Sequence, residues 1–132
     1  MGKGTVLNKA DIFKIRPVSH VETVEVEEFP GVVFGIKVMS AGARDDYDNS
    51  MFELEDKADG GFKVKPVRKD ARLRLILHTV CDPSTGALLF DETDIPELRE
   101  FPGPAIQTLF DAASKLNALS KDKDEGKEME KN

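Results

Sequence analysis

The sequence feature that most constrains this fold is an apolar stripe near the middle of the chain. Five residues follow the i, i+3, i+4, i+7, i+8 spacing of a helix with one buried face; they are Leu73, Ile76, Leu77, Val80 and Cys81. Pro83 follows and cannot continue a helix. The segment DPSTG at 82–86 predicts a turn in which Gly86 takes positive φ, and ALLF at 87–90 predicts an extended return. We therefore expect a buried helix that ends at a Pro/Gly turn.

The only cysteine, Cys81, lies three residues after His78 and directly before Asp82, so a reactive cluster has to be considered. A nucleophilic cysteine must ionise, and both the negative end of a helix dipole and the charge of Asp82 disfavour a thiolate here. A free cysteine usually packs as a small hydrophobe. We expect Cys81 to be buried beside a surface histidine, without a catalytic role.

Other signatures of chemistry are missing from the sequence. Structural zinc takes four Cys or His ligands, and the chain offers only His20, His78 and Cys81. DDYDNSMFELED at 45–56 lacks the central glycine of a calcium loop, and GKGT at 2–5 lacks the Gly-rich segment and strand of a phosphate-binding loop. We expect a protein that is not an enzyme and that uses no cofactor or metal.

The length and net charge of the chain further narrow the class of protein and the kinds of partner that we expect. The chain of 132 residues suits one domain, and its net charge of −6 argues against nucleic acid as a partner. No apolar run approaches the roughly 20 residues of a membrane span, and we find no signal peptide, so we expect a cytoplasmic protein without a membrane partner. The basic run KVKPVRKDARLR at 63–74 is interpreted as a solvated linker and helix start. A nucleic-acid patch and docking of an acidic partner stay open for this run.

The N-terminal third predicts a short helix and two strands. LNKADIFKI at 7–15 suits a helix capped by Asn8 and limited by Pro17. Residues 20–38 alternate as two strands. Pro30 and Gly31 between them suit the centre of a type II turn, within a connection longer than a tight hairpin.

The middle of the chain predicts a second helix and a loop. Ser40 can cap a helix over 41–55, whose apolar face is Ala43, Tyr47, Met51 and Leu54. Phe52 projects away from that face. Gly60, Gly61 and Pro66 indicate a loop or flexible connection over 56–66.

The C-terminal third predicts one short and one long helix, followed by a charged tail. DETDIPELREF at 91–101 suits one or two helical turns, and Pro104 suits the first position of the last helix. The apolar face of that helix is Ile106, Leu109, Phe110, Ala113 and Leu116. Residues 121–132 are too charged to order themselves, so we expect a disordered tail or a frayed helix end.

These elements predict a single α+β domain over 1–120 and a charged tail over 121–132. The expected fold is a two-stranded antiparallel β element packed against a small bundle of about four helices. Apolar or basic side chains left outside the helix stripes are the candidates for partner contact; they are Phe52, Phe62, Arg72 and Arg74.

The order of the elements carries a resemblance. ADIF is followed by VETVEVEEF, by VVFGIKVMSAGARDDYD and by ARLRLILHTVCDPSTGALLFDETDIPEL, and the chain ends in EGKEMEKN. The most specific part is a helix ending in Val-x-Asp, a turn with glycine, LLF and an Asp-rich short helix. In these features the chain resembles the tail assembly chaperones of long-tailed, siphovirus-type bacteriophages. The linker 56–66 and the DPSTG turn match that pattern least well.

The resemblance implies a non-catalytic role in the host cell cytoplasm. Such proteins bind and solubilise the tape measure protein, help recruit tail tube protein, form oligomers and are absent from the mature virion. A frameshifted longer form often accompanies them. The alternative is a structural tail or head–tail connector protein that is retained in the virion, and a DNA-binding regulator comes third.

Overall fold

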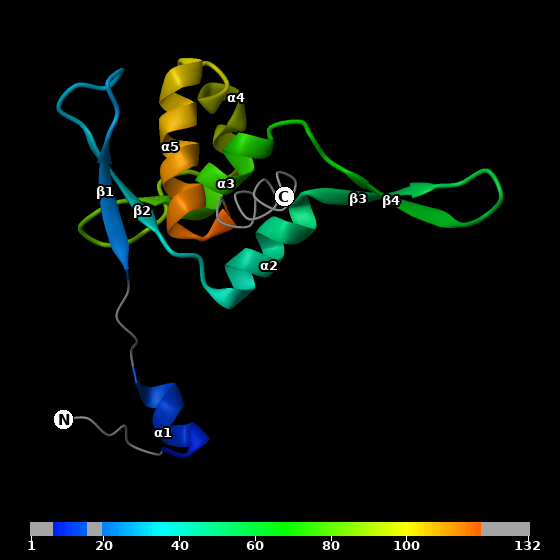
Figure 1. Cartoon of the computed structure of the whole chain (residues 1–132), viewed down its shortest axis with the longest axis horizontal. Coiled ribbons are helices and arrows are strands. Elements are labelled where there is room, and N and C mark those ends of the chain that lie inside the picture. The colour runs from blue at the N-terminus through cyan, green and yellow to red at the C-terminus, as the bar shows by residue number, and fades with distance from the viewer. Residues whose placement is uncertain (1–6, 16–19, 120–132) are drawn as a thin grey trace, which may run out of the picture.

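The computed structural model describes residues 7–15 and 20–119 (Figure 1). These residues form helices and antiparallel strands, which confirms the predicted α+β class. The elements are α1 (Lys9–Lys14), β1 (Val21–Glu25), β2 (Val33–Lys37), α2 (Ala41–Ser50), β3 (Phe52–Asp56), β4 (Phe62–Pro66), α3 (Ala71–Thr79), β5 (Val80–Cys81), the 3-10 turn η1 (Glu92–Asp94), α4 (Ile95–Leu98) and α5 (Gly103–Leu116).

The predicted two-stranded element is a three-stranded antiparallel sheet of order β1-β2-β5. Its β1–β2 connection turns at Pro30 and Gly31, as predicted: the Val32 amide donates to the Phe29 carbonyl at 3.1 Å, and Gly31 has φ 81°. The third strand was missed, because β5 pairs with β2 through only two residue pairs, Gly35 with Cys81 and Ile36 with Val80.

The helix predicted to reach Cys81 ends earlier, at Thr79. Val80 and Cys81 leave the helix because the free edge of β2 offers them backbone partners. Burial of all five stripe residues is confirmed. The following turn and return are also confirmed: Gly86 has φ 76°, and the Leu89 amide donates to the Val80 carbonyl at 3.1 Å.

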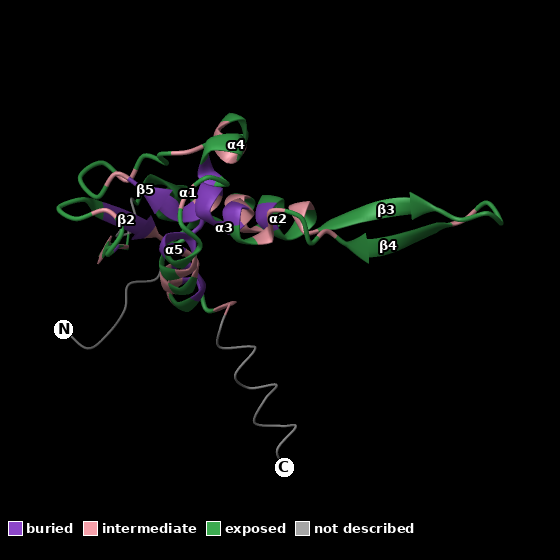
Figure 2. Cartoon of the chain, turned by 90° about the horizontal axis from the view of Figure 1, so that it is seen from above, coloured by how far each residue is buried: buried purple, intermediate pink, exposed green. Residues whose placement is uncertain are grey.

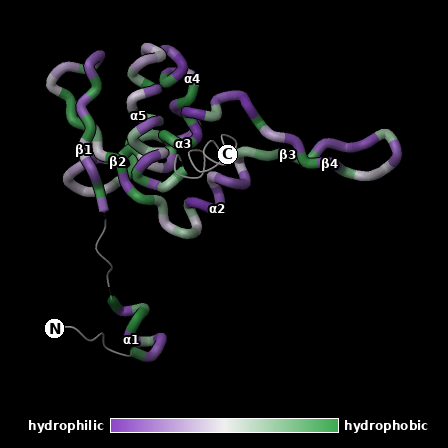
Figure 3. Tube along the Cα trace, in the orientation of Figure 1, coloured by the Kyte–Doolittle hydropathy of each residue, from purple (hydrophilic) through white to green (hydrophobic). Residues whose placement is uncertain are grey.

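The hydrophobic core lies around α3, which packs against α5, α2 and β2. Figure 3 shows hydrophobic segments along β2 and α3 meeting in the centre of the molecule. Leu75 is fully buried although it lies off the predicted stripe, because α3 is covered on more than one side. From α5 the fully buried Leu109 and Ala113 reach the same core.

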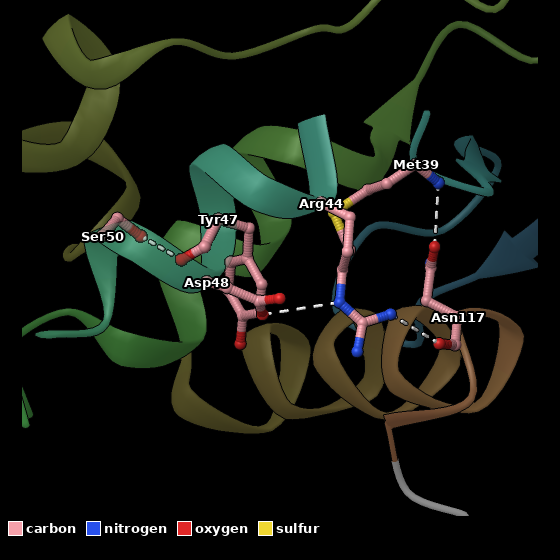
Figure 4. Close-up of polar contacts among 6 residues, drawn as sticks. All are labelled: Met39, Arg44, Tyr47, Asp48, Ser50 and Asn117. Atoms are coloured by element: carbon pink, nitrogen blue, oxygen red, sulfur yellow. Dashed lines mark hydrogen bonds and ion pairs between the residues drawn. The ribbon is translucent and has the colours of Figure 1, made fainter. Parts of the chain in front are cut away.

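A buried asparagine ties the end of α5 to the chain between β2 and α2 (Figure 4). The Asn117 Oδ1 atom accepts a hydrogen bond from the Met39 amide at 2.8 Å, and its Nδ2 atom donates to the carbonyls of Lys37 and Ala113 at 3.2 and 3.0 Å. Its own carbonyl accepts from Arg44 at 3.3 Å. The side chain therefore fixes α5 against the start of α2, which Ser40 caps as predicted.

The helix predicted over 41–55 ends at Ser50, and the loop predicted over 56–66 is wrong. Residues 52–66 form a β-hairpin, β3–β4, called here the arm. Its strands pair from Phe52 with Pro66 to Asp56 with Phe62, and its turn contains Gly60 at φ 92°. The apolar/charged alternation of FELE at 52–55 and of FKVK at 62–65 favours strands over a helix. Figure 2 shows the arm extending away from the remaining described elements, which we call the body.

Helix α1, at the N-terminal end of the described chain, adds nothing to the core. Asn8 caps α1 as predicted, accepting from the Asp11 amide at 2.8 Å, and α1 buries none of its residues. The predictions for Pro17 and for the tail at 121–132 lie outside the described residues. Among the helices in the described ranges, none has the length and apolar character needed to cross a membrane.

Candidate partner-binding groove

A groove of about 980 Å³ lies where the arm joins the body. The end of α2, the base of the arm, the start of α3, α4 and the first half of α5 all contribute to its lining. The apolar part of the lining includes Met51, Phe52, Phe101 and Phe110, and each of these side chains is at least partly accessible. Such a lining suits apolar side chains of another molecule.

Phe101 is held at the groove by other aromatic rings of the body. Its ring centroid lies 5.0 Å from that of Phe29 and 6.4 Å from that of Phe90, and Phe29 in turn contacts Phe34 edge-on at 5.9 Å. These tilted and edge-on arrangements are favourable for aromatic pairs. The Phe101 side of the groove therefore rests on packed aromatic rings of the body.

An ion pair between Arg99 and Asp70 joins α4 to the start of α3 in the lining of the groove. The Arg99 guanidinium donates to the carboxylate of Asp70 at 2.6 Å, and the Asp70 side chain is mostly buried. Asp70 precedes the first residue of α3 and has left-handed backbone geometry, with φ 57°. The contact fixes the start of α3 relative to α4.

Arg74 holds the base of the arm. Its guanidinium donates to the carbonyl of Ser50, the last residue of α2, at 2.7 Å and to the Lys69 carbonyl at 3.2 Å. Beside it the Val67 amide donates to the Met51 carbonyl at 2.8 Å, where the two strands leave the body. Arg74 therefore stabilises the junction, and its predicted contact with a partner stays a prediction.

Positive charge lines the groove near the start of α3. Arg68 and Arg72 are exposed lining residues, and in the ranges 7–15 and 20–119 neither forms an ion pair. On the α5 side, Asp111 already accepts a hydrogen bond from Gln107 at 2.7 Å. The groove thus combines an apolar lining with two guanidinium groups that can receive carboxylates.

The arm has two chemically different faces. Strand register places Phe52, Leu54, Phe62 and Val64 on one face with Pro66 and Asp56; we call it the apolar face. The charged face carries Glu53, Glu55, Lys63 and Lys65. Lys65 contacts both glutamates at 3.3 Å, and its hydrogen bonds to Glu55 and Glu53 raise its pKa. Phe52 and Pro66 also line the groove, so the apolar face continues from it.

The structure places the four residues predicted for partner contact in three different positions. Phe52 and Arg72 line the groove, Phe62 lies at the far end of the arm, and Arg74 is engaged at the junction. Leu54 was predicted to be a core residue and is instead 68% exposed. Neither Leu54 nor Val64 was predicted to lie on the surface, although the alternating pattern of FELE and FKVK could have indicated that both side chains are exposed.

Cys81 and His78, the residues considered for a reactive cluster, lie in different surroundings. Cys81 is fully buried, and burial raises the pKa of its thiol; Lys37 opposes this rise and Asp82 adds to it. His78 lies on α3 with its ring 6.0 Å from that of Tyr47, whose pKa is raised mainly by burial. Within the described ranges, no three His, Cys, Asp or Glu residues lie close enough together to hold a metal ion.

Comparison with known protein families identifies a match over most of the chain. A family model described as "Phage tail assembly chaperone" matches residues 7–131 of the 132 in the chain. No curated protein and no solved structure matches the chain.

Proposed function

The chain belongs to the phage tail assembly chaperone family, and from this premise we propose that it binds and solubilises the tape measure protein of its phage and helps recruit tail tube subunits. It acts without catalysis in the host cell cytoplasm and leaves before the virion is complete. The observation that supports this role is the groove at the base of the arm, with its apolar lining and its two arginines.

The groove suits an amphipathic helix of the tape measure protein. A helix bound in this way inserts side chains from positions i, i+3 or i+4 and i+7 into an apolar groove. Met51, Phe101 and Phe110 offer flexible and aromatic surface for such side chains. The segment we expect here is therefore a helix with an apolar stripe that would be poorly soluble without a partner.

Charge further defines this segment. Arg68 and Arg72 lie at the groove without ion-pair partners among the described residues. Arginine forms directional, often paired, hydrogen bonds with carboxylates. We propose that the bound helix carries Asp or Glu beside its apolar stripe, so that these charges reach Arg68 and Arg72.

Co-expression with the tape measure protein of the same phage tests the proposal. The wild-type chain should increase the soluble fraction of the tape measure protein several-fold, and Arg72→Glu should remove most of that gain. Lys69→Glu is the matched control, because Lys69 is exposed on the neighbouring turn but does not line the groove. No gain with the wild-type chain, or equal losses in both variants, would contradict the proposal.

Mass spectrometry of purified phage particles tests the second part of the proposal. A chaperone should be missing from particles in which tube and tape measure proteins are readily detected. Finding this chain at a fixed copy number per particle would instead support a structural tail or connector protein.

A further inference from the structure

The apolar face of the arm is left uncovered by the body. Every residue of β3 and β4 is exposed, and the large apolar residues Phe52, Leu54, Phe62 and Val64 are 54%, 68%, 66% and 63% exposed. Figure 2 shows the arm standing clear of the body. A two-stranded hairpin is only marginally stable in water, and packing against a helix is one way to stabilise it. A helix that covered this face would therefore stabilise the arm.

We propose, taking the proposed function as given, that the helix bound in the groove continues along the arm and packs on its apolar face. Groove and arm then form one binding site. Two residues join the two parts, because Phe52 and Pro66 pair at the base of the arm and also line the groove. From there the apolar surface continues through the pair Leu54 and Val64 to Phe62 at the far end.

A helix suits this face of the arm better than a strand does. An added strand would pair with the edge of β3 or β4 through its backbone, and it would leave the apolar side chains in water. A helix lying on the face covers them with the side chains of one stripe. The opposite face is unsuited to an apolar stripe, because Lys65 there contacts both Glu53 and Glu55 at 3.3 Å.

The length of the arm sets a minimum length for the bound segment. From Phe52 to Asp56 the strand rises about 14 Å, at roughly 3.4 Å per residue. A helix rises about 1.5 Å per residue, so roughly nine helical residues cover this distance. The apolar stripe of the bound helix must therefore continue for about nine residues beyond the part that fills the groove.

Charges at the two ends of this surface define the polarity of the bound segment. Arg68 and Arg72 lie at the groove end, whereas Asp56 is the one charged residue among the strand residues of the apolar face and lies at the far end. Within residues 7–15 and 20–119 none of these three forms an ion pair. Acidic side chains of the helix therefore belong at the groove, and a Lys or Arg belongs roughly nine or more residues away, beside Asp56.

Co-expression with the tape measure protein of the same phage compares the two faces of the arm. The double variant Leu54→Thr/Val64→Thr removes apolar surface at the central pair. Glu55→Thr/Lys63→Thr is the matched control, because these residues form the adjacent pair on the opposite face and the net charge is unchanged. Threonine suits strands, so both double variants keep the hairpin. The first should lower the yield of soluble tape measure protein several-fold, and the control should keep the wild-type yield.

The outcomes separate this site from the proposed function. Equal yields with the two double variants would overturn binding along the arm. If Arg72→Glu alone lowered the yield in that case, the groove would remain the binding site and the proposed function would stand. A wild-type chain that gave no gain in soluble tape measure protein would contradict the proposed function, and the extended site with it.

Photo-cross-linking of the purified complex measures the register of the bound helix. Benzoylphenylalanine replaces Phe62 at the far end of the arm, Phe110 in the groove or, as the control, Lys63 on the charged face. Mass spectrometry should map the products from positions 62 and 110 to one continuous segment of the tape measure protein, roughly nine or more residues apart. Position 63 should give several-fold less product. Equal yields from positions 62 and 63, or products from 62 and 110 in unconnected segments, would refute the extended site.

Discussion

The Asp70 carboxylate, at the start of α3, accepts a hydrogen bond of 2.6 Å from Arg99 and does so from a left-handed backbone conformation with φ 57°. That conformation costs an ordinary residue roughly 1–2 kcal/mol, and less for aspartate or glycine. We expect Asp70→Ala to lower the free energy of unfolding by about 2 kcal/mol. Asp70→Gly loses only the ion pair and should lower it by about half as much. Urea unfolding measures both, and equal losses would contradict the backbone argument.

Gly35 allows β5 to approach β2 closely. A Cβ atom at Gly35 would lie 2.9 Å from both the carbonyl oxygen and the Sγ atom of Cys81, so the sheet would have to shift. We expect Gly35→Ala to destabilise the fold by about 2–4 kcal/mol. Gly42 in α2 is the matched control, because nothing lies within 4 Å of its Cβ position. Gly42→Ala should stabilise the protein by about 0.5–1 kcal/mol, so thermal denaturation should shift in opposite directions.

The buried hydrogen bonds of Asn117 should make it essential to the fold. Asn117→Ala would leave the buried Met39 amide without its acceptor and should cost about 2–3 kcal/mol. Asn49→Ala is the control, since Asn49 is exposed on α2. Chemical denaturation of the two variants side by side measures the difference. Similar stability of both would show that the hydrogen bonds of Asn117 contribute little.

Burial of Cys81 predicts a decrease in stability at alkaline pH. Its pKa is raised in the folded protein, whereas the thiol of an unfolded chain ionises near ~8.5. Between these two values the unfolded state has lost a proton that the folded state keeps, so the free energy of unfolding falls as pH rises. We expect Cys81→Ala to be less stable at pH 7 but to lose less stability from pH 8 to 10. Urea titrations across this range check the slope; an unchanged slope would contradict the assignment to Cys81.

The same burial predicts slow modification of the thiol. At pH 7 a thiol reagent should label Cys81 no faster than the protein opens, and the rate should increase with added denaturant. Labelling that is complete within seconds in the native protein would contradict a buried, neutral thiol. Free cysteine in the same buffer provides the reference rate.

The parts of the fold that depend on local chemistry were predicted from the sequence. The caps at Asn8 and Ser40 and the turns at Gly31 and Gly86 were predicted correctly, because each depends on residues a few positions apart. The strand at Val80 and Cys81 was missed because its partner, Gly35, is more than forty residues away. Only the folded chain brings this pair together.

The arm was missed for a different reason. Met51 and Leu54 continue the helical spacing of Ala43 and Tyr47, so the sequence was interpreted as one helix as far as residue 55. The apolar/charged alternation that begins at Phe52 was therefore not recognised as a strand. The groove depends on how α2, α3, α4 and α5 pack, which no local pattern specifies. Phe52 and Arg72, two of the residues predicted for partner contact, line this groove, and their contact with a partner stays a prediction.

The arm leaves and re-enters the body at neighbouring points, where the Val67 amide meets the Met51 carbonyl, and no residue of its strands belongs to the core. The hydrophobic core that stabilises the body therefore includes no side chain between positions 52 and 66. Mutations in the strands of the arm are expected to leave the packing of the core unchanged. A short reverse turn could therefore replace the arm between Met51 and Val67 while the core of the body stays intact.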